Sequence, residues 1–206
     1  MKNVFGVWLP DHEKHLVDHF ATEEGWTYQK HKLNAALGFC TARGLALDIG
    51  GHCGLWSMHL TKLFDEVVAF EPRPEHRECY VMNVDGNFTL HACGLGDREM
   101  RAGIHHTEGS SGDSFVEPGD SVDIKLLDSF NLAPDFIKID TEGFEYFIIR
   151  GGEKTIKAHR PVIIVEQKPG KGKSFGLKDT AAVDLLVSWG YELKQVLSGD
   201  YILVCN

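Results

Sequence analysis

Short apolar runs alternate with amphipathic segments along most of the chain, from residue 44 onward. Five runs have the length and composition of strands and are apolar nearly throughout: 45–50, 66–71, 88–93, 135–140 and 161–167. The segments with helical spacing are 54–64, 74–84, 143–158 and 179–189. Continuously apolar strands are typical of a sheet that is covered on both faces. The alternation therefore predicts βαβ units and a parallel sheet with helices on both faces.

The two ends of the chain depart from this alternation. Near the C-terminus, two strand-like runs flank a Ser-Gly-Asp turn at 198–200, which predicts an antiparallel hairpin. Residues 1–43 carry helical patterns, and we expect them to form an N-terminal helical cap before one globular unit, 44–206. The segment 168–178 has the Gly- and Lys-rich composition of a surface loop, with a lid over a site as the alternative.

Composition narrows the class of protein. With 206 residues and 43% hydrophobic content, the chain suits one globular domain with a core of its own. A formal net charge of −9 disfavours nucleic acid and anionic membranes as partners. The opening residues lack a signal-peptide pattern, and no apolar run reaches the length of a membrane span. The five cysteines are scattered without CxxC spacing, so we expect reduced thiols and a cytoplasmic protein.

The first candidate chemistry lies in the glycine-rich turn of "LALDIGGHCG", residues 45–54. Its Gly50, Gly51 and Gly54 match neither the G-x-G-x-x-G pattern of dinucleotide folds nor the P-loop. The glycine spacing therefore disfavours an NAD-dependent enzyme. The turn does match D-x-G-x-x-x-G from Asp48, whose negative charge disfavours a pyrophosphate. S-adenosylmethionine has no phosphate and carries a cationic sulfonium, so we predict that it binds here with Asp48 toward its cationic end.

Carboxylates stand at the ends of four predicted strands: Asp48, Glu71, Asp140 and Glu166. In a doubly wound sheet, ligands bind in the crevice outside these strand ends. Glu71 follows Gly50 by 21 residues, a position from which a carboxylate accepts both ribose hydroxyls. Four neighbouring carboxylates require compensating charge or hydrogen-bond donors. We expect the cationic cofactor to supply this compensating charge. A divalent metal is the alternative source, which we do not favour, so no metal ligand is assigned.

A second motif is the run "IKIDTEGFEYFIIRGG" at 137–152, with the pattern K-I-D-x-E-G-x-E before a helix and glycines. This run resembles the FkbM-type methyltransferases, a branch of the class I S-adenosylmethionine-dependent family. The D-x-G-x-N-x-G turn of that family is matched from Asp48 to Gly54, with His52 where asparagine is usual. The resemblance extends approximately over residues 45–168.

The resemblance implies an α/β fold of the Rossmann-like class I methyltransferase type. Such a fold has a mainly parallel seven-stranded sheet, helices on both faces and a C-terminal antiparallel hairpin. It also implies methyl transfer to a hydroxyl of a sugar or other small molecule. The expected cofactor-binding residues are Asp48, Ile49, Gly50, Gly51, His52, Gly54, Glu71, Pro72, Cys93, Gly94 and Asp140.

An alcohol acceptor must lose its proton as it attacks the methyl group. Asp140 and Glu142 lie at the strand end where that proton would be accepted, and we predict both as catalytic residues. The alternative for Glu142 is that it caps the following helix. Lys138 lies two residues before Asp140, on the same strand face, and is expected to pair with it. The lysines of 168–178 indicate an anionic acceptor, such as a phosphorylated or carboxylated sugar.

Two other functions stay open at this point. The first is N-methylation of another substrate class, although "KIDTEGF" lacks the N/D-P-P-Y type of run found in such enzymes and the chain is acidic. The second is a regulatory protein that binds S-adenosylmethionine without turnover. Slow consumption of S-adenosylmethionine by the purified protein distinguishes an enzyme from such a binding protein.

Overall fold

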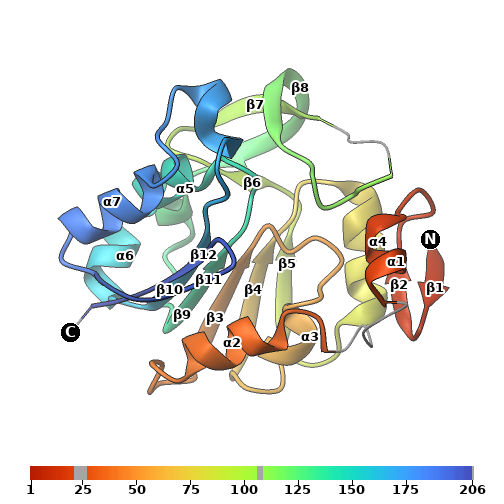
Figure 1. Ribbon diagram of the computed structural model, residues 1–206, viewed down its shortest axis with the longest axis horizontal. Helices are drawn as coiled ribbons and strands as arrows, with labels where there is room; N and C mark the ends of the chain where they lie inside the picture. Colours follow the sequence, from red (N-terminus) through yellow and green to blue (C-terminus); the bar gives the residue numbers. More distant parts are fainter. Residues whose placement is uncertain (21–26, 106–108, 206) are drawn as a thin grey trace.

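A seven-stranded sheet forms the centre of the protein (Figure 1). The computed structural model describes residues 1–20, 27–105 and 109–205. Across the sheet the strands follow one another as β11 (Glu192–Leu197), β12 (Asp200–Val204), β10 (Val162–Glu166), β9 (Phe136–Ile139), β3 (Leu45–Ile49), β4 (Glu66–Phe70) and β5 (Phe88–His91). Neighbours from β10 to β5 are parallel, whereas β12 is antiparallel to β10 and β11. The predicted mainly parallel sheet with its C-terminal antiparallel hairpin is confirmed.

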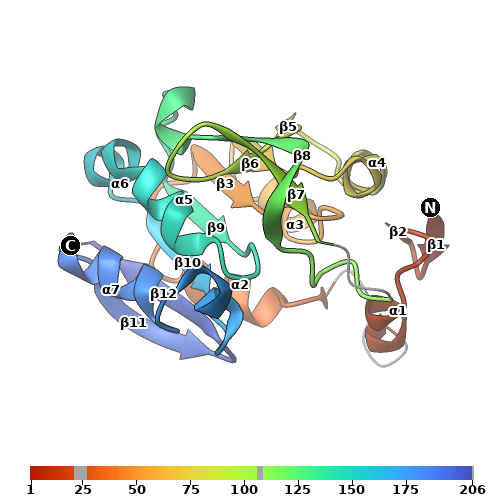
Figure 2. The ribbon, with the colours of Figure 1, turned by 90° about the horizontal axis from the view of Figure 1, so that it is seen from above.

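Helices cover both faces of this sheet (Figures 1 and 2). Leu47 and Ile49 of β3 pack on one face in a core shared with α5, α6 and α7, whereas Ala46 packs on the other face with α2 and α3. Helix α4 covers Ala69 of β4 on that second face. Burial on both faces explains why the strands are apolar nearly throughout. The helices are α2 (Lys30–Leu37), α3 (Ser57–Leu60), α4 (Pro74–Asn83), α5 (Glu145–Gly151), α6 (Glu153–His159) and α7 (Ala181–Ser188).

A smaller sheet, which the sequence analysis did not predict, follows β5. Its order is β6 (Gly94–Leu95), β8 (Val116–Lys125) and β7 (Met100–Ile104). Leu95, Ala102 and Ile124 bury this sheet in the same core as α5 to α7. Most of β8 is exposed and carries Pro118 and Gly119, so its sequence lacks the clear alternation of a half-buried strand.

The N-terminal segment begins with a hairpin of β1 (Lys2–Val4) and β2 (Val7–Leu9), followed by α1 (His15–Phe20) and then α2. Its turn residues Phe5 and Gly6 both have positive φ, at 49° and 90°, as in the tight turns that suit hairpins. The helices α1 and α2 lie within the expected helical cap, and the hairpin before them is an addition to it. Residues 21–26 of the expected cap lie outside the described residues.

Two predicted helices are shorter in the structure than their sequence patterns suggest. In the segment 54–64 only α3 is helical, and the segment 143–158 is divided into α5 and α6 at Gly152. A Cβ on Gly152 would lie 2.7 Å from the Leu127 side chain, so close packing on the preceding loop requires glycine there. The loop 168–178 contains one 3-10 turn, η3 (Lys171–Phe175). No helix of the described residues has the length and apolar character of a membrane span.

The contact between α5 and the turn after β6 gives a test of this packing. A Cβ on Gly151 would lie 1.8 Å from the carbonyl oxygen of Gly96, so Gly151→Ala forces two backbone segments apart. We expect this change to lower the free energy of unfolding by about 3 kcal/mol, as overpacked cores do. Gly112→Ala is the matched control, because a Cβ at Gly112 meets nothing within 4 Å. Equal thermal unfolding midpoints for the two variants would contradict this packing.

Candidate active site

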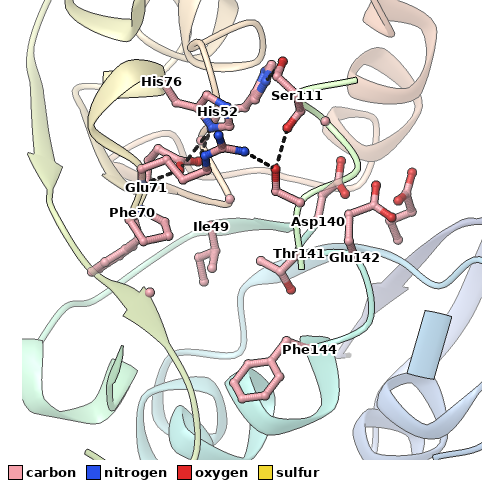
Figure 3. Close-up of a pocket in the computed structure, with 18 of the residues that line it drawn as sticks. Ile49, His52, Phe70, Glu71, His76, Ser111, Asp140, Thr141, Glu142 and Phe144 are labelled. Carbon is pink, nitrogen blue, oxygen red and sulfur yellow. Dashed lines mark hydrogen bonds and ion pairs between the residues drawn. The ribbon is translucent and has the colours of Figure 1, made fainter. Parts of the chain in front are cut away.

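A cavity opens at the carboxyl ends of the parallel strands, between the sheet, the N-terminal segment and the loop 110–114 (Figure 3). Most residues predicted for the site line it, namely Ile49, Gly50, Gly51, His52, Glu71, Pro72, Gly94, Asp140 and Glu142. Asp48, Gly54 and Cys93 lie outside the lining. Cys93 is buried in the core, and Gly54 packs against Tyr80 and Val84 of the α4 region. Contacts of these three with a cofactor stay a prediction.

The glycine turn after β3 is held by the backbone of two neighbouring strands. The amides of Gly50 and Gly51 both donate to the carbonyl oxygen of Phe70, at 3.0 and 3.1 Å. Gly50 has φ +78°, and a Cβ there would lie 2.0 Å from the carbonyl oxygen of Asp140. Only glycine permits this conformation together with this close approach. The turn therefore joins the β4 and β9 ends of the cavity into one wall.

Lys138 is a buried cation between two of the strand-end carboxylates. Asp48 and Lys138 are register partners in the parallel strands β3 and β9. The Lys138 Nζ lies 3.3 Å from Asp48 Oδ1 and 3.8 Å from Asp140 Oδ2, and it donates to the Gly50 carbonyl oxygen at 2.9 Å. Burial lowers the pKa of Lys138, but the charges of Asp48 and Asp140 outweigh it and raise the pKa above its ordinary value. Lys138 is therefore a permanent positive charge beneath the turn.

Asp48 lies under the turn and has no exposed surface. Its position at a strand end predicts a carboxylate that faces the ligand, whereas the structure directs it to Lys138 and to Ser57, whose hydroxyl donates to Asp48 Oδ2 at 2.7 Å. A buried carboxylate requires such partners because its desolvation is costly. Asp48 thus acts on the cavity through Lys138 and through the start of α3.

Glu71 is a buried acceptor at the end of β4. Its Oε1 accepts from the Arg73 amide at 2.9 Å and lies 3.3 Å from His76 Nδ1, and its Oε2 accepts from the His52 amide at 2.9 Å. Burial raises the pKa of Glu71, but the hydrogen bond from His76 and the two backbone amides outweigh it and lower the pKa. Glu71 is therefore an ionised carboxylate that lines the cavity.

His52 occupies the turn position where the related family has asparagine. Its φ of 47° is left-handed, a conformation in which Asn and His are both enriched among non-glycine residues. The ring lies 4.3 Å from the His76 ring between centroids, and Nε2 lies 2.7 Å from the Ser111 hydroxyl. Burial lowers the pKa of His52 well below its ordinary value, so the ring is neutral.

Three carboxylates gather on the other side of the cavity. Asp140, Glu142 and Glu166 each offer an oxygen within 4.8 Å of the others, a set that could also hold a divalent cation. Two lysines already compensate this cluster. Lys168 Nζ lies 2.9 Å from Glu166 Oε1, and Lys171 Nζ lies 2.7 Å from Glu142 Oε2.

The three carboxylates differ in protonation because their surroundings differ. Burial and the charge of Asp140 raise the pKa of Glu166 to about 9 and also raise the pKa of Glu142. Burial raises the pKa of Asp140 as well, but Lys138 and the hydrogen bond from Glu166 outweigh it and lower that pKa. At neutral pH Glu166 is therefore the protonated donor and Asp140 the ionised acceptor.

Glu142 does not cap the helix that follows it. No side chain caps the start of α5. Glu145, the first residue of α5, instead holds the preceding turn, because its Oε1 accepts from the Thr141 and Gly143 amides at 3.0 and 2.9 Å. Glu142 has a left-handed φ of 55° and directs its carboxylate to Lys171 instead. The capping alternative predicted for Glu142 is therefore not seen in the structure, and Glu142 faces the cavity.

The sequence did not predict the cavity-lining residues that precede the glycine turn in the chain. His15, Leu16, Tyr28 and Gln29 of the N-terminal segment line the cavity, opposite the strand ends. No spacing links these residues to the motifs at 48–54 or 138–145, so the pattern carries no signal for them. The apolar lining from β4, β6 and β8 was also missed, and its members are Phe70, Leu95 and Ile124.

Comparisons with known proteins agree with this arrangement. The profile of the Methyltransferase FkbM domain family matches residues 48–193. Among solved structures, a methyltransferase FkbM from Methylobacillus flagellatus KT is similar, with a TM-score of 0.53 and 22% identity over 78% of this chain. The match spans only 43% of that longer chain.

A second similar structure is magnesium protoporphyrin IX methyltransferase from Synechocystis PCC 6803 with bound SAM. Its TM-score is 0.50 and its identity 10%, over 92% of this chain and 94% of that one. Both structures share the Rossmann-like fold of class I methyltransferases with this chain. A comparison with curated protein sequences found no match.

The role of Lys138 can be tested through stability. Lys138→Met leaves Asp48 and Asp140 near one another without their cation, and we expect a loss of about 3–5 kcal/mol in the free energy of unfolding. Adding Asp48→Asn removes the charge that the first change leaves unpaired, so the double variant should be more stable than Lys138→Met alone. Urea unfolding of the wild type, the two single variants and the double variant measures this. Purely additive losses would contradict a direct Asp48–Lys138 interaction.

The raised pKa of Glu166 predicts a pH-dependent stability. Between its ordinary pKa of 4.5 and the folded pKa of about 9, the folded protein binds a proton that the unfolded chain has released. The wild type should therefore lose stability as pH rises through this window, by up to about 1.4 kcal/mol per pH unit. Glu166→Gln removes this loss, so its advantage over the wild type should grow from pH 6 to pH 8.5 in urea unfolding.

The control for this pH series is Glu153→Gln on α6, where the carboxylate pairs with Lys157 at the surface and is half exposed. Its stability should follow the wild type at every pH. A constant difference between Glu166→Gln and the wild type across the series would contradict a protonated Glu166.

Proposed function

Because the chain belongs to the FkbM methyltransferase domain family, we propose that it transfers a methyl group from S-adenosylmethionine to a hydroxyl group of a sugar or other small molecule. One observation carries the proposal. A single cavity joins the glycine turn and the ionised Glu71 on one side to the ionised Asp140 on the other. The first side suits a nucleoside with a charged tail, and the second suits an acceptor that loses a proton.

The residues present fit S-adenosylmethionine. Gly50 leaves no room for a side chain at the point where the turn meets β9, so a ligand can approach the backbone closely. Glu71 accepts two backbone hydrogen bonds and lies beside the His76 ring, and a carboxylate has about four acceptor positions, so it can still accept from a ribose hydroxyl. Phe70, Leu95 and Ile124 add an apolar surface that suits the adenine ring.

The chemistry at the acceptor side depends on Asp140. When bound, S-adenosylmethionine supplies a methyl group that the sulfonium charge already activates, so the protein's task is alignment and proton removal. Asp140 Oδ2 is held by Lys138 and accepts the proton that the acceptor hydroxyl releases. Glu166, protonated at neutral pH, donates to Asp140 and keeps its carboxylate oriented. Glu142 is the alternative proton acceptor in the same cluster.

The charge of the cluster favours a neutral acceptor. Lys168 and Lys171, whose positive charges suggested an anionic substrate, lie beside two carboxylates other than the protonated Glu166: Lys168 Nζ is 3.7 Å from Glu142 Oε1, and Lys171 Nζ is 3.0 Å from Asp113 Oδ1. They therefore lack the unbalanced charge that would attract a phosphate or carboxylate. The same lysines compensate the carboxylates that a divalent metal would otherwise neutralise. Among possible acceptors we therefore favour neutral, hydroxyl-rich molecules. We also expect methyl transfer to proceed without a divalent metal.

Two variants separate the cofactor side from the acceptor side. Glu71→Ala should weaken S-adenosylmethionine binding at least about tenfold in calorimetry, because it removes a charge-assisted acceptor. Asp140→Asn should bind S-adenosylmethionine within a few-fold of wild type but lower kcat about 100-fold or more, the usual contribution of a general base. Formation of S-adenosylhomocysteine with neutral and with carboxylated sugars, with and without a chelator, measures turnover.

The matched control is Asp120→Asn, since Asp120 is an exposed carboxylate paired with Arg101 on the small sheet. It should behave as wild type in both assays. Full turnover by Asp140→Asn would exclude Asp140 as the base, and unchanged binding by Glu71→Ala would contradict the cofactor assignment. Binding of S-adenosylmethionine with no turnover on any acceptor would favour the regulatory alternative.

A further inference from the structure

The N-terminal segment lies outside the region that matches the family, residues 48–193, yet it lines the cavity through α1 and through Tyr28 and Gln29. Figures 1 and 2 both show α1 beside the chain that leads into β8. We call residues 13–16 and the loop 109–114 together the roof of the cavity. The contacts that hold the roof in place are made by two buried residues, Glu13 and Ser111.

Glu13 is the central residue of the roof and is 0% exposed. Its Oε1 accepts from the Leu16 amide at 2.7 Å, which fixes the start of α1. Its Oε2 accepts from the Ser111 amide at 2.6 Å and also from the Ser111 hydroxyl, in a short hydrogen bond. One buried carboxylate thus ties the helix of the N-terminal segment to the loop across the cavity. Charge-assisted hydrogen bonds of this kind are about twice as strong as neutral ones.

Further contacts hold the same two segments together. The amides of Lys14 and His15 both donate to the carbonyl oxygen of Gly109, at 3.0 and 3.3 Å. Lys2 Nζ donates to the Glu13 carbonyl oxygen at 2.5 Å, which links the hairpin to the same point. The N-terminal segment is also attached to α4, because the Asn83 side chain bonds both backbone groups of Trp8. The roof is therefore positioned by the body of the protein as well as by its own contacts.

The hydrogen bonds of the roof continue into the glycine turn. Ser111 is 1% exposed, and its hydroxyl lies between Glu13 Oε2 and His52 Nε2. Because a carboxylate only accepts, the Ser111 hydroxyl donates its one proton to Glu13. It must then accept from His52, which requires the proton of the imidazole on Nε2. The amide of His52 in turn donates to Glu71, so the chain of contacts ends at the predicted ribose acceptor.

We propose that Glu13 and Ser111 are positioning residues of this site, which latch the N-terminal segment over the glycine turn and hold His52 as its Nε2–H tautomer. This inference rests on the proposed function for its effect on the cofactor, because the latch acts on His52 and Glu71, which line the cofactor side. Neither residue touches the reacting groups. The latch makes cofactor binding depend on a segment that is no part of the matched family region.

The lowered pKa of His52, caused first by burial, is consistent with a neutral ring that has a defined tautomer. The left-handed turn at residue 52 requires only a residue that tolerates positive φ, which asparagine also does. Histidine adds a reach from the turn to Ser111, at 2.7 Å, that the shorter asparagine side chain lacks. The departure from the family pattern and the presence of the roof are thus explained by the same contact.

The test uses the full chain and two variants of the latch. Ser111→Ala removes the acceptor of the His52 proton and leaves the Ser111 amide bond to Glu13 in place. We expect it to weaken S-adenosylmethionine binding about 5- to 10-fold by calorimetry, the effect of one buried hydrogen bond. Ser129→Ala is the matched control, because the Ser129 hydroxyl makes one local bond to the Leu126 carbonyl oxygen, away from the cavity. Its affinity should equal that of the wild type.

The second measurement is the tautomer of His52, read from the nitrogen chemical shifts of its ring by NMR. The wild type and Ser129→Ala should show the proton on Nε2, and Ser111→Ala should show a mixture. Glu13→Met should shift the proton toward Nδ1, because it removes the acceptor of the Ser111 hydroxyl and leaves that hydroxyl to donate to His52. This variant keeps the size of the side chain and provides the test if Ser111→Ala folds poorly.

The results separate the latch from the proposed function. A wild type with the His52 proton on Nδ1, or variants of Ser111 and Glu13 that keep the wild-type tautomer, would overturn the latch. Binding by Ser111→Ala as tight as by Ser129→Ala would overturn it as well. A wild type that shows the Nε2–H tautomer but does not bind S-adenosylmethionine would contradict the proposed function while supporting the latch.

Discussion

The buried ammonium of Lys138 is the interaction on which the rest of the site depends. Parallel strands bring their carboxyl ends to one edge of the sheet, and in this chain those ends carry acids. Lys138 lies between Asp48 and Asp140 and also holds the Gly50 carbonyl oxygen. Without this charge the carboxylates would repel one another in a medium that screens them poorly. With it, the glycine turn and Asp140 are held in a fixed relation.

The two sides of the cavity along this sheet edge differ in charge and in proposed function. On the β4 side, backbone amides and His76 keep Glu71 ionised, and apolar residues complete a surface for a nucleoside. On the β10 side, Glu166 retains its proton at neutral pH beside the ionised Asp140, and the Lys168 ammonium lies 2.9 Å from Glu166 Oε1. The two sides meet at Gly50, whose lack of a side chain allows β3 to touch the backbone of β9. The residues proposed to bind the cofactor and to accept the proton thus line one cavity.

Much of the fold and of the site could be predicted from the sequence, because the hydrophobic pattern and the positions of the glycines and acids indicate the same arrangement. The apolar runs predicted the sheet, and the glycine spacing together with the strand-end acids placed the cavity at the correct edge. The contact of Asp48 with a cofactor stays a prediction, and its complete burial against Lys138 and Ser57 is a feature that a strand-end position does not reveal. The small sheet was missed because β8 is mostly exposed. The roof was missed because Glu13 and Ser111 are 98 residues apart, and no local pattern reports such a contact.

The most direct test of the account is a crystal structure of the protein with S-adenosylhomocysteine. We predict that the ribose hydroxyls contact Glu71, that the adenine lies against Phe70 and that the sulfur lies between the glycine turn and Asp140. Lys138 should keep its contacts with Asp48, Asp140 and the Gly50 carbonyl oxygen in that complex. A ligand bound outside this cavity, or a ribose that makes no contact with Glu71, would contradict the account.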